Sequence, residues 1–149
     1  MKKMIAMLIT GILISMSGYG KKVVLNAAPE DVVNAFNIRF PNISKVTWET
    51  VDSMNYYATF QYNRTFQIVK FDKQGMWLES IEEMESDKFS REVWKMLEDN
   101  YGNYSVFEAK LITSLNASFY QILLYDGSNS LLVQILTNGV LLIEMEIED

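Results

Sequence analysis

The sequence changes from helix to strand within one stretch, Phe40-Pro41-Asn42-Ile43-Ser44-Lys45-Val46-Thr47-Trp48-Glu49. Proline disfavours the helical conformation in the residue before it, so Pro41 predicts the end of a helix at Phe40. A strand is expected to begin soon after the proline. Val46, Trp48 and Thr50 alternate along this strand and therefore share one face of it.

A helix is predicted before this stretch and three further strands after it. Pro29, Glu30 and Asp31 favour a helix start, and Val32, Phe36 and Phe40 form its apolar stripe. Turn sequences around Met54, Arg64 and Gly75 separate the strands. The four expected strands cover residues 46–50, 56–62, 66–71 and 76–81.

The same order of elements returns in the second half of the chain. A shift of 61 residues places Val32, Phe36 and Phe40 on Val93, Leu97 and Tyr101, and a shift of 64 places Gly75 on Gly139. A second helix is therefore expected over residues 89–101. Strands are expected over residues 105–113, 119–125, 131–136 and 140–147.

These patterns predict an α+β fold of two tandem repeats, each a helix followed by four antiparallel strands. Each helix has one apolar stripe, so both should pack on one face of the antiparallel sheet. The repeats are expected over residues 28–84 and 85–149, with an acidic connection at Glu82–Asp87 between them. Together they form one compact domain, with either one eight-stranded sheet or two adjoining four-stranded sheets.

Residues 1–20 are predicted to be a signal peptide. Lys2 and Lys3 precede an apolar run from Met4 to Met16, and small residues follow it. The run is shorter than the roughly 20 residues that span a bilayer, so no membrane anchor is expected after cleavage. We therefore expect a periplasmic or secreted protein. Because the sequence contains no cysteine, it is not a lipoprotein.

The composition excludes several kinds of chemistry. The 149 residues include no histidine and no cysteine, which excludes thiol nucleophiles, zinc sites with Cys or His ligands and the commonest general base. No nucleophile or phosphate-loop motif is present, so we expect no catalytic residues, no cofactor and no enzyme activity. The net charge of −6 argues against nucleic-acid binding. The sequence indicates no particular oligomeric state.

A family resemblance rests on the residues already described. Its motifs are Phe40-Pro41-Asn42, Lys45-Val46-x-Trp48-Glu49, Tyr57-x-x-Phe60 and Phe71-Asp72-x-x-Gly75-x-Trp77-Leu78. Over residues 28–147 the chain resembles the β-lactamase-inhibitor-like (BLIP-like), PepSY-like family of exported proteins in Gram-negative bacteria. The second half departs from the pattern at Gly102, Ala109 and Leu141. The resemblance implies a two-repeat fold and a sheet that presents a concave face to a partner.

Five residues are candidates for binding. Tyr57, Thr59 and Gln61 alternate on one face of the second strand, which is left open if the helices cover the other face. This polar and aromatic mixture suits a protein or peptide ligand, although a plain solvated face would have the same pattern. Trp48 and Trp77 are either anchors of a binding surface or core residues beneath the first helix.

The sequence favours an exported, non-enzymatic module that binds another exported protein. The alternative is an envelope sensor for a small ligand or a cation, with its site at Glu82, Glu83, Glu85 and Asp87. This acidic segment lacks the spacing and the glycine of a calcium loop. A solvated linker is therefore the competing interpretation of the same residues.

Overall fold

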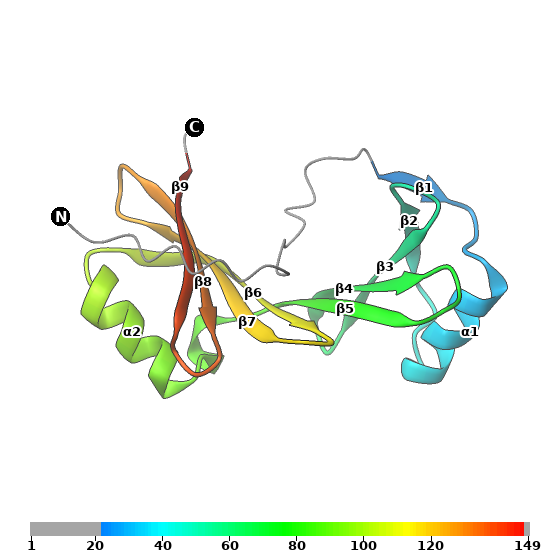
Figure 1. Ribbon diagram of the computed structural model, residues 1–149, viewed down its shortest axis with the longest axis horizontal. Coiled ribbons are helices and arrows are strands. Elements are labelled where there is room, and N and C mark those ends of the chain that lie inside the picture. Colours follow the sequence, from blue (N-terminus) through cyan, green and yellow to red (C-terminus); the bar gives the residue numbers. More distant parts are fainter. Residues whose placement is uncertain (1–21, 148–149) are drawn as a thin grey trace.

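The computed structural model describes residues 22–147, in which two helices pack on an antiparallel sheet of nine strands (Figure 1). The expected signal peptide at residues 1–20 lies outside the described residues. The strands are hydrogen-bonded in chain order, from β1 at one edge to β9 at the other. Within residues 22–147, no helix is long and apolar enough to cross a membrane.

The elements follow one another along the chain without a crossover. The helices are α1 (Glu30–Arg39) and α2 (Arg91–Tyr101), and a short 3-10 turn, η1 (Ser86–Lys88), precedes α2. The strands are β1 (Val23–Leu25), β2 (Thr47–Thr50), β3 (Asn55–Tyr62), β4 (Thr65–Asp72), β5 (Trp77–Glu83), β6 (Ser105–Ser114), β7 (Ser118–Tyr125), β8 (Ser130–Leu136) and β9 (Leu141–Ile147).

Local sequence explains both helices. The first turn of α1 carries Glu30 and Asp31, whose negative charges favour the positive end of the helix dipole. This helix ends just before Phe40, whose backbone N–H still donates to the carbonyl of Phe36. At the start of α2, the Ser90 hydroxyl accepts from the backbone N–H of Val93 at 3.3 Å and so caps the helix.

Both helices lie on the same face of the sheet. Residues that pair directly across neighbouring strands point to the same side. One such row begins at Phe60, which contacts Phe36 of α1 with ring centroids 5.0 Å apart. It ends at Tyr120, whose ring lies 5.1 Å from that of Phe89, just before α2. The residues between them in this row are Gln67, Glu82 and Leu111.

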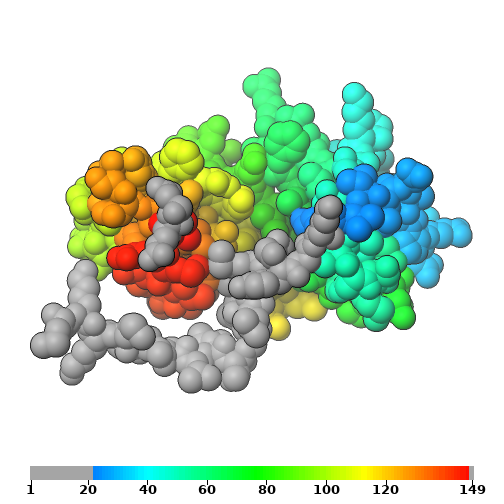
Figure 2. All heavy atoms as spheres, turned by 90° about the horizontal axis from the view of Figure 1, so that it is seen from above, coloured from blue at the N-terminus to red at the C-terminus, as the bar shows by residue number. Residues whose placement is uncertain are grey.

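Each helix covers its own hydrophobic core, and within the described residues the two cores have no buried residue in common. The core under α1 contains Val32, Phe36, Trp48, Tyr56, Ala58, Phe60, Val69 and Phe71. The core under α2 contains Phe89, Val93, Leu97, Tyr101, Ala109, Tyr120, Ile122, Leu124, Leu131, Val133 and Ile135. Figure 2 shows the first half of the chain, in blue to green, and the second half, in yellow to red, at opposite ends of the molecule.

The structure differs from the expected elements in two places. Strand β1 was not predicted, because three residues are too few to show a period. Glu82 and Glu83, expected in an acidic connection, belong to β5 instead. Glu82 pairs with Gln67 on one side and Leu111 on the other, so two neighbouring strands extend β5 through this acidic sequence. The nine strands form one continuous sheet rather than two adjoining ones.

Candidate binding site

The face of the sheet opposite the helices, here called the helix-free face, carries aromatic, apolar and charged side chains. One row of paired residues crosses it from β3 to β7 and consists of Thr59, Ile68, Ile81, Ile112 and Phe119. A second row in the first half consists of Glu49, Tyr57, Lys70 and Glu79. The helix-free face is therefore continuous between the two halves and is apolar at its centre.

Tyr57 is buried on the helix-free face between two lysine side chains. The amino nitrogen of Lys22 lies 4.7 Å from the centroid of the Tyr57 ring, and that of Lys70 lies 5.5 Å from it. Lys22 also approaches Glu49, with 3.7 Å between Nζ and Oε2. Burial raises the pKa of the Glu79 carboxyl, while the charge of Lys70 acts in the opposite direction. This corner is therefore a cluster of charges around an aromatic ring.

The structure places Thr59 and Gln61 on the same face as Tyr57. Thr59 is half-buried and Gln61 is exposed. Gln61 pairs with Phe66 of β4, whose side chain is 54% exposed. Phe66 was not singled out from the sequence. Alternation along β3 and along β4 places Gln61 and Phe66 on the helix-free face. Their direct pairing, however, depends on the β3–β4 register, which the sequence alone does not give.

Trp48 and Trp77 lie on the opposite side of the sheet, beneath α1. The ring of Trp48 meets that of Phe36 edge-on at 5.4 Å between centroids. Trp77 is half-buried under the guanidinium of Arg39, 4.7 Å from the ring centroid. Its Nε1–H donates to Ser80 Oγ at 2.8 Å. The structure therefore does not bring the two tryptophans together with Tyr57, Thr59 and Gln61.

The second half of the helix-free face is apolar around a pair of amides. Gln134 Nε2 donates to Gln121 Oε1 at 3.1 Å. Gln134 Oε1 is buried and has no hydrogen-bond partner within the described part of the chain. Leu123 and Leu132 pair beside these amides. Edge strand β9 adds three apolar side chains that are 36–40% exposed, Ile143, Met145 and Ile147.

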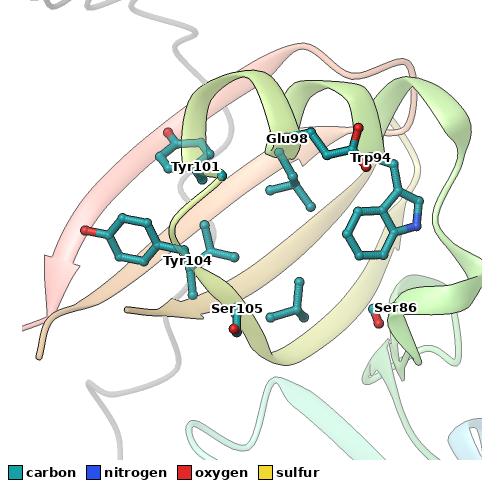
Figure 3. A pocket seen from close by; sticks show the side chains of 10 residues that line it. Ser86, Trp94, Glu98, Tyr101, Tyr104 and Ser105 are labelled. Atoms are coloured by element: carbon teal, nitrogen blue, oxygen red, sulfur yellow. The ribbon is translucent and has the colours of Figure 1, made fainter. Parts of the chain in front are cut away.

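A separate cavity of about 380 Å³ opens between α2 and the beginning of β6 (Figure 3). Leu97, Val106 and Leu124 provide its apolar wall. Figure 3 shows Trp94 and Glu98 on the α2 side of this cavity. Glu98 is the one acidic side chain among the residues that line it, and no lysine or arginine is among them.

The surroundings of this cavity are electrically negative. The Tyr101 hydroxyl donates to a carboxylate oxygen of Glu144, and burial together with this contact raises the pKa of Tyr101. The pKa of Tyr104 is also raised, first by desolvation and then by the charges of Asp126, Glu146 and Glu144. Carboxylates therefore lie on the β9 side of the cavity as well as on α2.

The acidic side chains of the described residues are not arranged as a metal site. Among residues 22–147, no group of three or more His, Cys, Asp or Glu side chains is placed to hold a metal ion. Glu82 faces the helix side of the sheet and Glu83 the helix-free face, because successive residues of a strand alternate. The acidic segment therefore does not place its first two carboxylates together.

Solved structures with the same architecture come from Bacteroides. A DUF2874 family protein from Bacteroides ovatus superposes with a TM-score of 0.76 at 20% identity, covering 84% of this chain and 92% of that one. A BLIP-like protein from Bacteroides fragilis gives a TM-score of 0.73 at 19% identity, covering 84% and 90%. The fold is BLIP-like. No family model matches the chain, and the search of curated proteins found no match.

Proposed function

We propose that this chain is an exported, non-enzymatic protein-binding module that uses its helix-free face to hold a protein partner. The observation that carries the proposal is the placement of both helices on one side of a continuous sheet. The other side is left with exposed Phe66, Gln61 and the apolar side chains of β9. Phenylalanine and methionine are among the residue types enriched in the cores of protein interfaces.

The two halves are proposed to be the two repeats expected from the sequence. The support is that a turn glycine contacts the first turn of the helix in the same way in both halves. Gly75, in the turn before β5, lies against the backbone oxygen of Asp31 in the first turn of α1. Gly139, in the turn before β9, lies against the backbone oxygen of Glu92 in the first turn of α2. The periplasm or the exterior is the proposed location, because residues 1–20 have the pattern of a signal peptide.

The test is capture of a partner with matched surface variants. The exported protein, tagged at its C-terminus, is incubated with envelope extract of its host, and retained proteins are quantified by mass spectrometry. We expect one stoichiometric protein that survives moderate salt. The double variant Gln61→Lys/Phe66→Lys should retain about tenfold less of it, because two lysines on the helix-free face disrupt an apolar contact.

The control is Asn34→Lys/Asn37→Lys, which adds the same charge on the exposed side of α1. This variant should retain the partner as well as the parent does, and both variants should keep the melting temperature of the parent within a few degrees. Equal loss from both double variants would show that charge, and not the helix-free face, governs binding. Absence of any stoichiometric partner in repeated trials with folded bait would refute the proposal.

A further inference from the structure

The cavity beside α2 has the chemistry of a site for a positively charged group on an apolar stem. Its volume of about 380 Å³ lies within the range of roughly 300 to 1,000 Å³ typical of ligand pockets. Leu97, Val106 and Leu124 can contact a hydrocarbon stem, and Trp94 presents an indole ring beside Glu98. An aromatic face and a carboxylate at one mouth together attract a cation.

Within the described part of the chain no ion pair holds the Glu98 carboxylate, although its charge contributes, after Asp99, to the raised pKa of Lys95. On the same helix, Lys95 is held by Asp99, with 2.7 Å between Nζ and Oδ2. None of the ion pairs formed among residues 22–147 includes Glu98. No lysine or arginine lines the cavity. The charges of Asp126, Glu144 and Glu146 around Tyr104 extend the negative potential along the β9 side.

We propose that this cavity is an anchor site for an arginine or lysine side chain of the protein partner. The inference rests on the proposed function, since the partner carries the cation. It adds a second contact region on the α2 side of the molecule, away from the helix-free face. Within such a contact region, an anchor residue that fills a pocket commonly contributes a large share of the binding energy.

The first test uses small probes and needs no partner. The ¹⁵N-labelled exported protein is titrated with Nα-acetyl-arginine amide and, separately, with the uncharged Nα-acetyl-norleucine amide. We expect the arginine probe to shift the Trp94 indole N–H resonance and the amides of residues 97–106 in a saturable way. The norleucine probe should bind at least about fivefold more weakly, because it lacks the charge.

Two variants locate the effect. Glu98→Gln should weaken binding of the arginine probe about fivefold, whereas Glu92→Gln, on the same helix but outside the cavity, should not. Unchanged resonances of the core amides show that both variants remain folded. Equal binding of the two probes, or unchanged binding by Glu98→Gln, overturns the proposal.

The second test identifies the source of the cation. In the capture experiment, Glu98→Gln should retain about tenfold less partner than Glu92→Gln does. The arginine probe could bind while Glu98→Gln leaves the amount of captured partner unchanged. That result would assign the cavity to a free cationic ligand and overturn the anchor role. A third result is selective binding of the arginine probe with no captured partner. The proposed function and the anchor role would then both be refuted, and the cavity would be a cation site without a protein partner.

Discussion

Glu79 shows how the environment of one residue on the helix-free face controls its charge. The side chain is half-buried, and it pairs across the strands with Lys70 on one side and Ser114 on the other. Burial raises the pKa of its carboxyl above the ordinary value of 4.5, and the Lys70 charge offsets only part of this effect. The native state therefore binds the proton more tightly than the unfolded chain does.

This raised pKa makes a prediction about pH. For a carboxyl with a raised folded pKa, the free energy of unfolding falls as the pH rises from the unfolded pKa through the folded one. Glu79→Gln cannot lose a proton there. Its melting temperature should match the parent near pH 4 and exceed it by roughly 1–3 °C at pH 7, a small gain because solvent screens part of the effect.

Thermal unfolding followed by circular dichroism between pH 4 and pH 7 checks this expectation. Glu83→Gln removes the same charge from the same strand and face at an exposed position, and its difference from the parent should stay constant across that range. A lower melting temperature for Glu79→Gln at pH 7 would mean that attraction to Lys70 outweighs the cost of burial.

Which candidate residues share a surface was predictable from the sequence only in part. Alternation along β3 correctly places Tyr57, Thr59 and Gln61 on one face, because a strand alternates whatever its neighbours are. The contacts of Lys22 and Lys70 with the Tyr57 ring were not predictable. It depends on the β1–β2–β3–β4 register, and β1 is too short to be found from its own residues.

At the scale of elements, the turn glycines connect each sheet half to its helix. Gly75 and Gly139 have positive φ angles of 82° and 90°. A Cβ at Gly75 would lie 2.5 Å from the Asp31 oxygen, and one at Gly139 would lie 2.8 Å from the Glu92 oxygen. Gly127 has a positive φ of 100° in another hairpin turn, but nothing lies within 4 Å of its Cβ position.

Alanine substitutions at these three glycines distinguish the cost of a strained backbone from the cost of a close contact with a helix. Gly127→Ala should lower the free energy of unfolding by about 1 kcal/mol, the cost of a left-handed backbone for alanine. Gly75→Ala and Gly139→Ala should cost roughly 2–4 kcal/mol, because the backbone of the helix must also move. Urea unfolding measures all three. Equal costs would show that the turns do not depend on contact with the helices.

The sequence predicted the helices and eight of the nine strands because these elements have a clear period and end at turn residues. The Ser90 cap acts on the first turn of α2, and the positive φ angles of the turn glycines belong to the turns themselves, so both signals can be recognised from local sequence. The continuation of β5 through Glu82 and Glu83 was not predictable from local preference. Its backbone groups are paired by β4 and β6, and this long-range pairing overrides the low strand propensity of glutamate.

At the scale of the whole molecule, one sheet carries two cores. Strands β5 and β6 join the halves through five residue pairs, from Glu79 with Ser114 to Glu83 with Lys110. On the helix side of this junction lie the pairs Ser80 with Thr113 and Glu82 with Leu111, and no buried residue there belongs to both cores. Backbone hydrogen bonds and the Ile81–Ile112 pair on the helix-free face thus link two regions whose helix-covered cores are separate.

Separate cores predict separate local unfolding. Phe36→Ala removes the ring that contacts Phe40, Trp48 and Phe60 at centroid distances of 5.0–5.4 Å, at a cost of about 3–5 kcal/mol. Hydrogen exchange read by mass spectrometry should show faster exchange in α1 and β2–β4, while β7 and β8 keep their protection, because opening free energies differ between cooperative units.

The complementary variant is Ile122→Ala in the core under α2, where the side chain is fully buried. It should speed exchange in α2 and β6–β8 and leave β3 and β4 protected. If either substitution instead speeds exchange equally in both halves, the β5–β6 ladder transmits the loss and the sheet unfolds as one unit. A protein partner that lies across the helix-free face would then stabilise both halves together, whereas with separate units it would protect mainly the half that it contacts.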